Sequence, residues 1–348
     1  MNVALISLNK YGDIIGKKIG DSIPIHIFSK NKIKNFNIVK LVEELMKNYD
    51  AIIFVSSTGI AIRTIAPFIK SKSEDPAIIV VDILGKYVIS LLSGHLGGAN
   101  EFSEKIAEIM NAEAIITTAT DNLNLKAPDI IAKENNLIID NMDDAKCISA
   151  LMVNGENIVF EDEENLIHTP KGYGGNLQTA SGVVYVTNKL NYFNTYGKMA
   201  VLKLIRKNVI IGIGCRKDYS IEAMQKTVRE KLKEYNIDER AVKTVTSCNI
   251  KSEEKAIIEL GKFLGAQFKT FSREDIKSIE YKYKGSKFVE DHIGVKAVCE
   301  PCVELSGGKI LVSKLNLSGM TLCIGVDTMH NSQVTIDDVW IDKKRGKL

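Results

Sequence analysis

Short apolar runs alternate with amphipathic segments from the start of the chain to about residue 135. We expect strands where four to six apolar residues follow one another, and helices where apolar residues recur every three or four positions. This pattern predicts strands at 3–8, 51–55, 78–81, 87–91 and 114–117, and helices at 36–47, 60–69 and 101–110. Strands that alternate with helices are typical of an α/β domain with a largely parallel sheet.

A second alternating pattern begins at residue 209, with predicted strands at 209–213, 242–246, 267–270, 309–314 and 320–325. The segment between the two patterns has acidic runs, a glycine-rich turn at 171–176 and few periodic stretches. We therefore expect an α/β protein in which two α/β domains with largely parallel sheets are joined by a smaller middle segment. The predicted limits are 1–135, 136–206 for the middle or connecting domain, 207–326, and a C-terminal extension at 327–348.

The composition narrows the class of protein. A chain of 348 residues with 45% hydrophobic and 26% charged residues is typical of a soluble globular protein, and a net charge of +3 does not favour a broad nucleic-acid surface. The sequence shows no signal-peptide pattern and no apolar run long enough to cross a bilayer. Six scattered cysteines fit a reducing compartment. We expect a cytoplasmic protein without nucleic-acid or membrane partners.

The segment 93–100 combines glycines with polar side chains between a predicted strand and a predicted helix. Its candidate residues are Ser93, Gly94, His95, Gly97, Gly98 and Asn100. Glycines let the backbone approach a ligand, and the first amides of a helix attract carboxylates or phosphates. A histidine titrates near neutral pH. The alternative is a tight turn with a structural histidine, and the spacing matches neither a P-loop nor a dinucleotide motif.

Three further strand-to-helix junctions carry candidate ligand-binding residues. The first holds Ser57, Thr58, Gly59 and Arg63, the second Thr118 and Asp121, and the third Gly214 and Arg216. Arginine pairs with carboxylates in a bidentate way, and open α/β sheets bind ligands at the carboxyl edge of their strands. The hydroxyls also suit helix capping, and Asp121 is either a base or a turn residue.

The sequence Cys299-Glu300-Pro301-Cys302 has C-x-x-C spacing. We predict no metal site there, because no second cysteine or histidine pair completes a zinc ligand set. A redox role is open but has no further support. Glu300 is a candidate to accept a proton or hold a hydroxyl, although glutamate is more often a surface residue.

Together these motifs resemble the cobalt-precorrin-5A hydrolase family of anaerobic cobalamin biosynthesis. The resemblance rests on residues 56–67, 75–77, 80–82, 93–100 and 116–121, and on 212–216, Ser247, 253–255, 299–301 and 318–321 in the C-terminal half. It spans about residues 1–326 and is weakest at 136–200. Cys299 and Cys302 depart from the family pattern, which has small residues around Glu-Pro.

The resemblance implies that water opens the ring A δ-lactone of cobalt-precorrin-5A and that the former meso carbon leaves as acetaldehyde, giving cobalt-precorrin-5B. We expect His95 to act as general base or acid, amides near Gly94, Gly97 and Gly98 to stabilise negative charge, and Ser93 and Asn100 to orient the lactone. A rival role for His95 is axial contact with the cobalt. The remaining candidates would bind substrate.

The implied partner is a polycarboxylated cobalt-corrinoid intermediate, with neighbouring pathway enzymes as further candidates. No cofactor is expected, because the cobalt is carried by the substrate. The oligomeric state stays open. The competing function is a non-catalytic tetrapyrrole-binding or handover protein of the same pathway, since a fold does not by itself imply catalysis.

Overall fold

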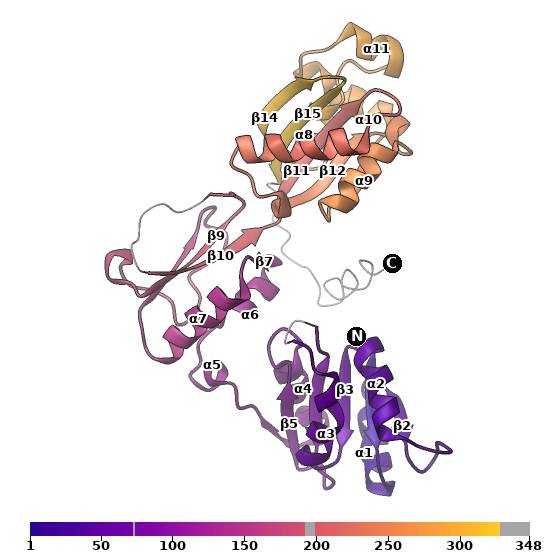
Figure 1. Ribbon diagram of the computed structural model, residues 1–348, viewed down its shortest axis with the longest axis vertical. Helices are drawn as coiled ribbons and strands as arrows, with labels where there is room; N and C mark the ends of the chain where they lie inside the picture. The colour runs from indigo at the N-terminus through magenta and orange to yellow at the C-terminus, as the bar shows by residue number, and fades with distance from the viewer. Residues whose placement is uncertain (72–73, 192–198, 328–348) are drawn as a thin grey trace.

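The computed structural model describes residues 1–71, 74–191 and 199–327. Three β-sheets follow one another along the chain, each with helices packed against it (Figure 1). We call the parts that contain them the N-terminal unit (3–115), the middle unit (119–206) and the C-terminal unit (209–327). The α/β prediction is confirmed, and the middle segment contains a sheet of its own.

The N-terminal unit contains a six-stranded sheet in the order β2-β1-β3-β4-β5-β6. Its elements are β1 Val3–Ser7, α1 Lys10–Gly20, β2 His26–Ser29, α2 Ile38–Asn48, β3 Ala51–Val55, α3 Thr58–Ile65, η1 Ala66–Phe68, β4 Ala77–Val81, β5 Tyr87–Leu92, α4 Ala99–Met110 and β6 Glu113–Ile115. Every residue of β3 and β4 is buried, because helices cover both faces of the sheet. Ile53 packs towards α1 and α4, and its neighbour Phe54 packs towards α2 and α3.

The direction of β5 decides which junctions lie together. Strand β3 is parallel to β4, with Val55 opposite Val81, but β5 is antiparallel to β4, with Val88 opposite Val81. The last residue of β5, Leu92, therefore lies beside Ile78 at the start of β4. Because β6 is parallel to β5, the carboxyl ends of β5 and β6 share one edge of the sheet. The carboxyl end of β3 lies at the opposite edge.

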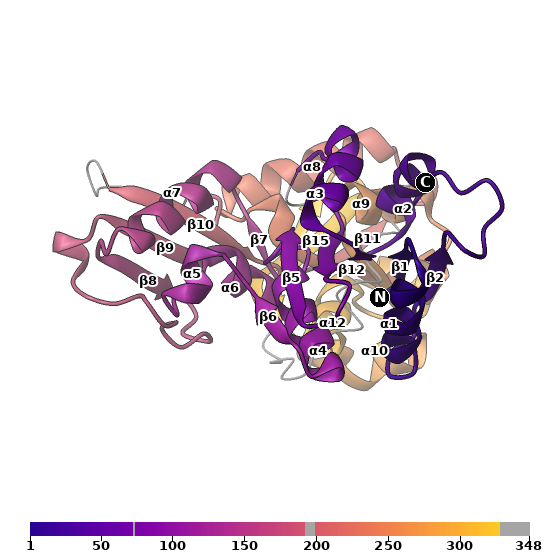
Figure 2. The ribbon, with the colours of Figure 1, turned by 90° about the horizontal axis from the view of Figure 1, so that it is seen from below.

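The middle unit has a four-stranded sheet in the order β7-β10-β9-β8, in which only the β7–β10 pair is antiparallel. Its elements are α5 Ala119–Asn122, α6 Pro128–Glu134, β7 Leu137–Ile139, α7 Met142–Val153, β8 Ile158–Asp162, η2 Leu177–Thr179, β9 Gly182–Thr187 and β10 Ala200–Arg206. Ile131 and Ala132 of α6 pack with Ile148 of α7 and Leu204 of β10. The core of this unit therefore includes residues of α6. Figure 2 shows α5 and α6 together with α7 and the strands of the middle unit.

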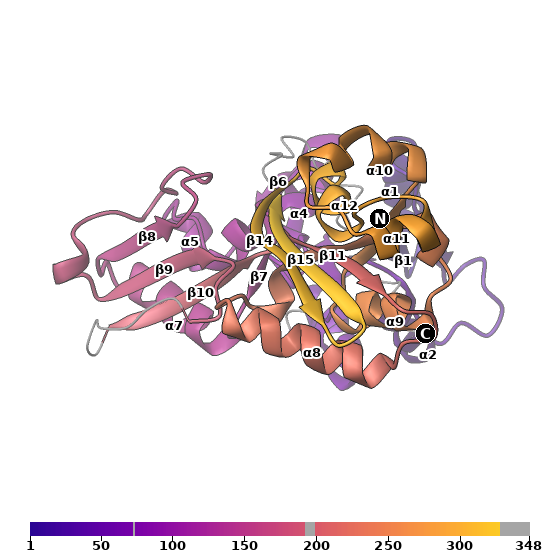
Figure 3. The same ribbon diagram turned by 90° about the horizontal axis from the view of Figure 1, so that it is seen from above.

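The C-terminal unit contains a mixed five-stranded sheet in the order β13-β12-β11-β15-β14. Its elements are β11 Val209–Cys215, α8 Ile221–Glu234, η3 Glu239–Ala241, β12 Val242–Cys248, η4 Asn249–Lys251, α9 Lys255–Phe263, β13 Gln267–Phe271, α10 Arg273–Ile279, η5 Glu280–Lys282, α11 Lys287–Ile293, α12 Cys299–Leu305, β14 Gly308–Leu317 and β15 Met320–Asp327. Strand β15 is antiparallel to both of its neighbours. Figure 3 shows α8 and α9 on one side of this sheet and α10 and α12 on the other.

The predicted C-terminal extension, 327–348, lies outside the described residues except for Asp327. The other domain limits stay predictions. No helix among the described residues is long and apolar enough to cross a membrane.

Candidate active site at the end of strand β5

His95 lies in the loop between β5 and α4, and its ring is held between two carboxylates. Its Nδ1 is 3.2 Å from Oδ1 of Asp129, and its Nε2 is 3.0 Å from Oδ2 of Asp121. Asp121 belongs to α5 and Asp129 to α6. The side chains of His95 and Asp129 are 11% and 7% exposed, whereas that of Asp121 is 31% exposed. The middle unit therefore contributes directly to the surroundings of His95.

The two carboxylates control the protonation of this ring. Burial lowers the pKa of His95, but the hydrogen bonds and negative charges of Asp129 and Asp121 outweigh burial and raise the pKa above its ordinary value. Only the imidazolium has a proton on each nitrogen to donate to both carboxylates. The arrangement therefore favours the charged form of His95.

Asn100, in the first turn of α4, ties the same cluster to the end of β6. Its Nδ2 donates to Oδ2 of Asp121 at 2.7 Å and to Oγ1 of Thr118 at 3.1 Å, while Ser90 Oγ donates to its Oδ1 at 2.6 Å. A side chain on Gly94 would place Cβ 2.6 Å from Asn100 Oδ1, so only glycine lets the loop lie against Asn100. The structure thus brings together His95, Asn100, Thr118 and Asp121.

Backbone amides in and just after the glycine-rich loop donate hydrogen bonds to carbonyl groups of the same loop. The amide of Gly98 donates to the carbonyl of His95 at 3.0 Å, that of Ala99 to Ser93 at 3.1 Å and that of Asn100 to Gly94 at 3.0 Å. The Gly98 amide therefore already has a partner within the loop, and its expected role in stabilising negative charge on a ligand stays a prediction. The closed turn satisfies this donor before any ligand arrives.

Ser93 is the strained residue of this loop. Its φ of 60° lies in the left-handed region, and its buried hydroxyl has no hydrogen-bond partner among the described residues. A Cβ on Gly97 would lie 2.7 Å from the carbonyl oxygen of Ser93, so the backbone of Gly97 lies directly over this serine. Strain and an unsatisfied hydroxyl in one buried residue are features that cluster at functional sites.

Four predicted ligand-binding residues lie away from His95. Ser57, Thr58, Gly59 and Arg63 follow β3 and therefore lie at the opposite edge of the N-terminal sheet. Arg63 is exposed, and its Nη1 is 3.4 Å from the position of a Cβ on Gly59. A role in binding stays a prediction for these residues, but the structure does not bring them to His95.

The C-terminal candidates form a separate group on another sheet (Figure 1). The amide of Arg216 donates to the carbonyl of Gly319 at 2.9 Å, and a Cβ on Gly214 would lie 2.7 Å from Thr321 Oγ1. Glu300 is buried rather than at the surface. Its Oε1 accepts from the amide of Lys314 at 3.2 Å, and its Oε2 has no partner among the described residues.

The cysteines of the C-x-x-C segment are buried and free. Burial raises the pKa of the Cys299 thiol to about 11 and also raises the pKa of Cys302. Thiolates are the reactive form of cysteine, so this environment favours packing over redox chemistry. Among the described residues, no group of three or more histidine, cysteine, aspartate or glutamate side chains is placed to hold a metal ion.

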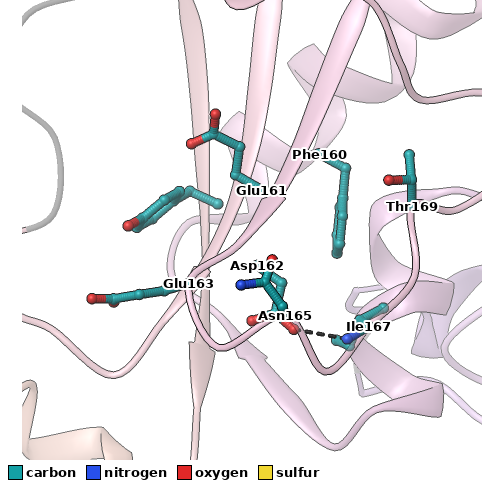
Figure 4. Close-up of a pocket in the computed structure, with 8 residues that line it drawn as sticks. Phe160, Glu161, Asp162, Glu163, Asn165, Ile167 and Thr169 are labelled. Carbon is teal, nitrogen blue, oxygen red and sulfur yellow. Dashed lines mark hydrogen bonds between the residues drawn. The ribbon is translucent and has the colours of Figure 1, made fainter.

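A cavity of about 470 Å³ lies in the middle unit, away from His95. Figure 4 shows Glu161, Asp162 and Glu163 among its lining residues. Asp162 accepts from the amides of Leu166 and Ile167, each at 2.8 Å, so its carboxylate organises the surrounding turn. Asp162 is paired with Arg206 at 2.6 Å and Glu163 with Lys189, and the residues that line the cavity include no histidine or arginine, so the His95 cluster remains the candidate active site.

Sequence reasoning missed Asp129 and Ser90. Asp129 follows Pro128 in a short helix and carries no motif, and it lies 34 residues from its partner His95. Ser90 is a single serine within the apolar strand β5. An aspartate in a short helix or a serine in a strand does not indicate from the sequence alone that the residue contacts a distant site.

Comparison with known proteins shows to which family the chain is similar. Three family models match successive parts of the chain, described as "Cobalamin synthesis G N-terminal" at residues 40–121, "Cobalamin biosynthesis central region" at 126–195 and "Cobalamin synthesis G C-terminus" at 209–325. A solved cobalamin biosynthesis protein G homologue from Sulfolobus solfataricus is 23% identical with a TM-score of 0.40, covering 94% of this chain and 97% of that one.

Two curated relatives match almost from end to end. The cobalt-precorrin-5A hydrolase of Salmonella typhimurium is 29% identical over 346 residues, covering 93% of this chain and 97% of the relative. That of Priestia megaterium is 27% identical over 333 residues, covering 88% of this chain and 89% of the relative. With three consecutive domain models and these relatives in agreement, the chain belongs to the cobalt-precorrin-5A hydrolase family of cobalamin biosynthesis.

Proposed function

We propose that this hydrolase of cobalamin biosynthesis opens the ring A δ-lactone of cobalt-precorrin-5A and releases acetaldehyde, giving cobalt-precorrin-5B. The observation that carries the proposal is the ring of His95, held by Asp121 and Asp129 beside the glycine-rich loop. The names of the curated relatives support the choice of substrate.

The reaction requires proton transfer in both directions. Water must lose a proton as it attacks the lactone carbonyl, and the leaving oxygen must gain one. The new hydroxyl then loses its proton as the carbon–carbon bond breaks and acetaldehyde leaves. A histidine with carboxylates on either side is suited to such transfers near neutral pH.

The substrate would bring its own metal. We propose no cofactor, because the cobalt enters as part of the corrinoid. Axial contact between His95 and this cobalt is disfavoured, since both ring nitrogens already face carboxylates. Lys133 of α6 provides a cation near the loop, with its Nζ 3.5 Å from the position of a Cβ on Gly98. This ammonium group is suited to hold a substrate carboxylate.

We place the reaction in the cytoplasm, where the free cysteines of the chain stay reduced. Neighbouring pathway enzymes are the partners proposed to deliver the substrate and receive the product. No nucleic-acid or membrane partner is proposed.

The test is acetaldehyde release from anaerobically prepared cobalt-precorrin-5A by the purified protein. We expect release by the wild type and by His168→Ala, which changes an exposed histidine of the middle unit, but little or none by His95→Ala. Substrate binding without acetaldehyde release by the wild type would refute the proposal and favour the handover protein.

A further inference from the structure

We infer that Asp121 is the general base of this site and His95 its general acid, with Asp129 as the positioning residue that holds His95. The inference rests on the proposed function, and it assigns the direction of proton transfer that the reaction leaves open. It is carried by the hydrogen bonds of the three side chains and by their different exposure to solvent.

The contacts of His95 make it a proton donor. Both ring nitrogens lie within 3.2 Å of a carboxylate oxygen, so a neutral ring would turn one lone pair towards a negative charge. The pKa of His95, lowered by burial but raised more by the two carboxylates, agrees with this geometry. A ring that already has both protons cannot accept a third from water.

The other titratable and charged groups near the cluster do not change the protonated state of His95. Asp121 reaches the ring from α5 and Asp129 from α6. The phenol of Tyr173 is near Asp129, but burial and the charge of Asp129 raise its pKa and keep it neutral. Lys133, one turn after Asp129 on α6, is 3.8 Å from Glu101 of α4. The carboxylates in direct contact with the ring therefore dominate its protonation.

Asp121 has one oxygen free for chemistry. Its Oδ2 accepts from His95 Nε2 at 3.0 Å and from Asn100 Nδ2 at 2.7 Å, while Oδ1 has no hydrogen-bond partner among the described residues. Asp129 is far more buried, and its Oδ1 also accepts from the amide of Ile130 at 3.1 Å. The more exposed carboxylate is therefore the one that can meet water and substrate.

The free oxygen of Asp121 is held in a defined direction. Asn100 bridges Asp121 and Thr118, and Ser90 Oγ fixes the amide of Asn100 by donating to its Oδ1 at 2.6 Å. A base that is already oriented avoids the entropic cost of finding the reactive geometry. Residues of β5, α4 and α5 therefore cooperate in placing one carboxylate oxygen.

Lactone opening then proceeds with a balanced set of protons. Oδ1 of Asp121 takes a proton from water as the water oxygen bonds to the lactone carbonyl carbon. The protonated Asp121 is a weaker acceptor, which frees the Nε2 proton of His95 for the leaving oxygen as the carbon–oxygen bond breaks. Oδ1 of Asp121, on the more exposed side chain, then releases its proton to solvent, and His95 takes up a proton from solvent, so both groups regain their starting state.

Carbon–carbon cleavage can use the same pair. Asp121 takes the proton of the new hydroxyl, the electrons of the carbon–carbon bond pass into the macrocycle, and the carbonyl of acetaldehyde forms. His95 supplies the proton that the macrocycle gains, and proton exchange with solvent then restores the carboxylate of Asp121 and the imidazolium of His95. No oxidant or reductant is required.

The test is the pH dependence of kcat for acetaldehyde release. We expect kcat of the wild type to fall at high pH, as His95 loses its proton. Asp121→Asn should lower kcat by about 10²–10⁴-fold with little change in KM, the usual contribution of a general base. Asp291→Asn, a change at an exposed aspartate of α11, should behave as the wild type.

Asp129→Asn should move the high-pH limb to lower pH, because it removes a charge that stabilises the imidazolium; a merely structural residue would not shift this limb. NMR of ¹⁵N-labelled protein should show both ring nitrogens of His95 protonated at neutral pH, without requiring any variant. A kcat that rises as His95 loses its proton, or an Asp121→Asn variant with full activity, would overturn the inference. Absence of acetaldehyde from the wild type would instead refute the proposed function.

Discussion

Replacing Lys203 with methionine tests the junction between the middle and C-terminal units. Lys203 of β10 donates to Asp238 Oδ2 at 2.8 Å and to the carbonyl of Leu190 at 3.3 Å, and the side chains of Lys203 and Asp238 are each 2% exposed. Methionine keeps the length of the side chain but removes the charge. Asp238, immediately before η3, would then keep only Arg240 as a cationic partner in the contacts given by the described residues.

The structure sets the size of the expected effect. Burial alone would raise the pKa of Asp238, but Arg240 and Lys203 hold it at about 2 instead of 3.8. That net shift corresponds to about 2–3 kcal/mol of stability. Removing one partner of a buried pair costs about 3–5 kcal/mol. Because Arg240 remains, we expect Lys203→Met to destabilise the protein by about 3 kcal/mol.

Hydrogen exchange read by mass spectrometry is the suitable assay, because three sheets need not unfold as one. We expect faster exchange in peptides that contain β10 and η3 of Lys203→Met. Lys262→Met, which removes an exposed ion pair with Glu259, is the matched control and should change almost nothing. Equal exchange rates in the two variants would refute the claim that the buried Lys203–Asp238 ion pair stabilises β10 and η3.

The same pair predicts a pH effect in the wild type. A carboxylate with a lowered pKa contributes stability above its unfolded pKa, and the contribution is lost as pH falls. The stabilisation by Asp238 should therefore be complete above about pH 4 and disappear towards pH 2. Urea unfolding between about pH 2 and pH 4 should show that the free energy of unfolding decreases as the pH falls.

Three further predictions concern other parts of the chain. His95, with its raised pKa, should stabilise its loop below pH 6.5 and lose this effect as pH rises through the folded pKa, so exchange at 93–98, corrected for its intrinsic pH dependence, should speed up there and should respond less in Asp129→Asn. Gly97→Ala should lower acetaldehyde release more than tenfold, because its Cβ would lie 2.7 Å from the carbonyl of Ser93, whereas Gly174→Ala, with nothing within 4 Å, should have little effect. An alkylating reagent at pH 8 should label the exposed Cys147 rapidly and the buried Cys302 slowly, as measured by mass spectrometry; equal rates would contradict the burial of Cys302.

The sequence by itself determined the class of fold and the centre of the candidate site. Apolar runs such as Ala51–Val55 and Ala77–Val81 predict buried strands because both of their faces are covered by helices. The glycines around His95 and the polar residues after β6 are local features, and the structure brings His95, Asn100 and Asp121 together as contacts.

Only the tertiary structure decided the direction of β5 and the partners of His95. An apolar strand has the same pattern of side chains whether it runs parallel or antiparallel to its neighbour, so nothing in 87–92 shows that Arg63 lies at the opposite edge. Asp129 reaches His95 because α6 packs in the core of the middle unit, and Glu300 is buried because α12 packs against β14. These contacts join residues distant in sequence, and packing between elements, rather than local pattern, places them.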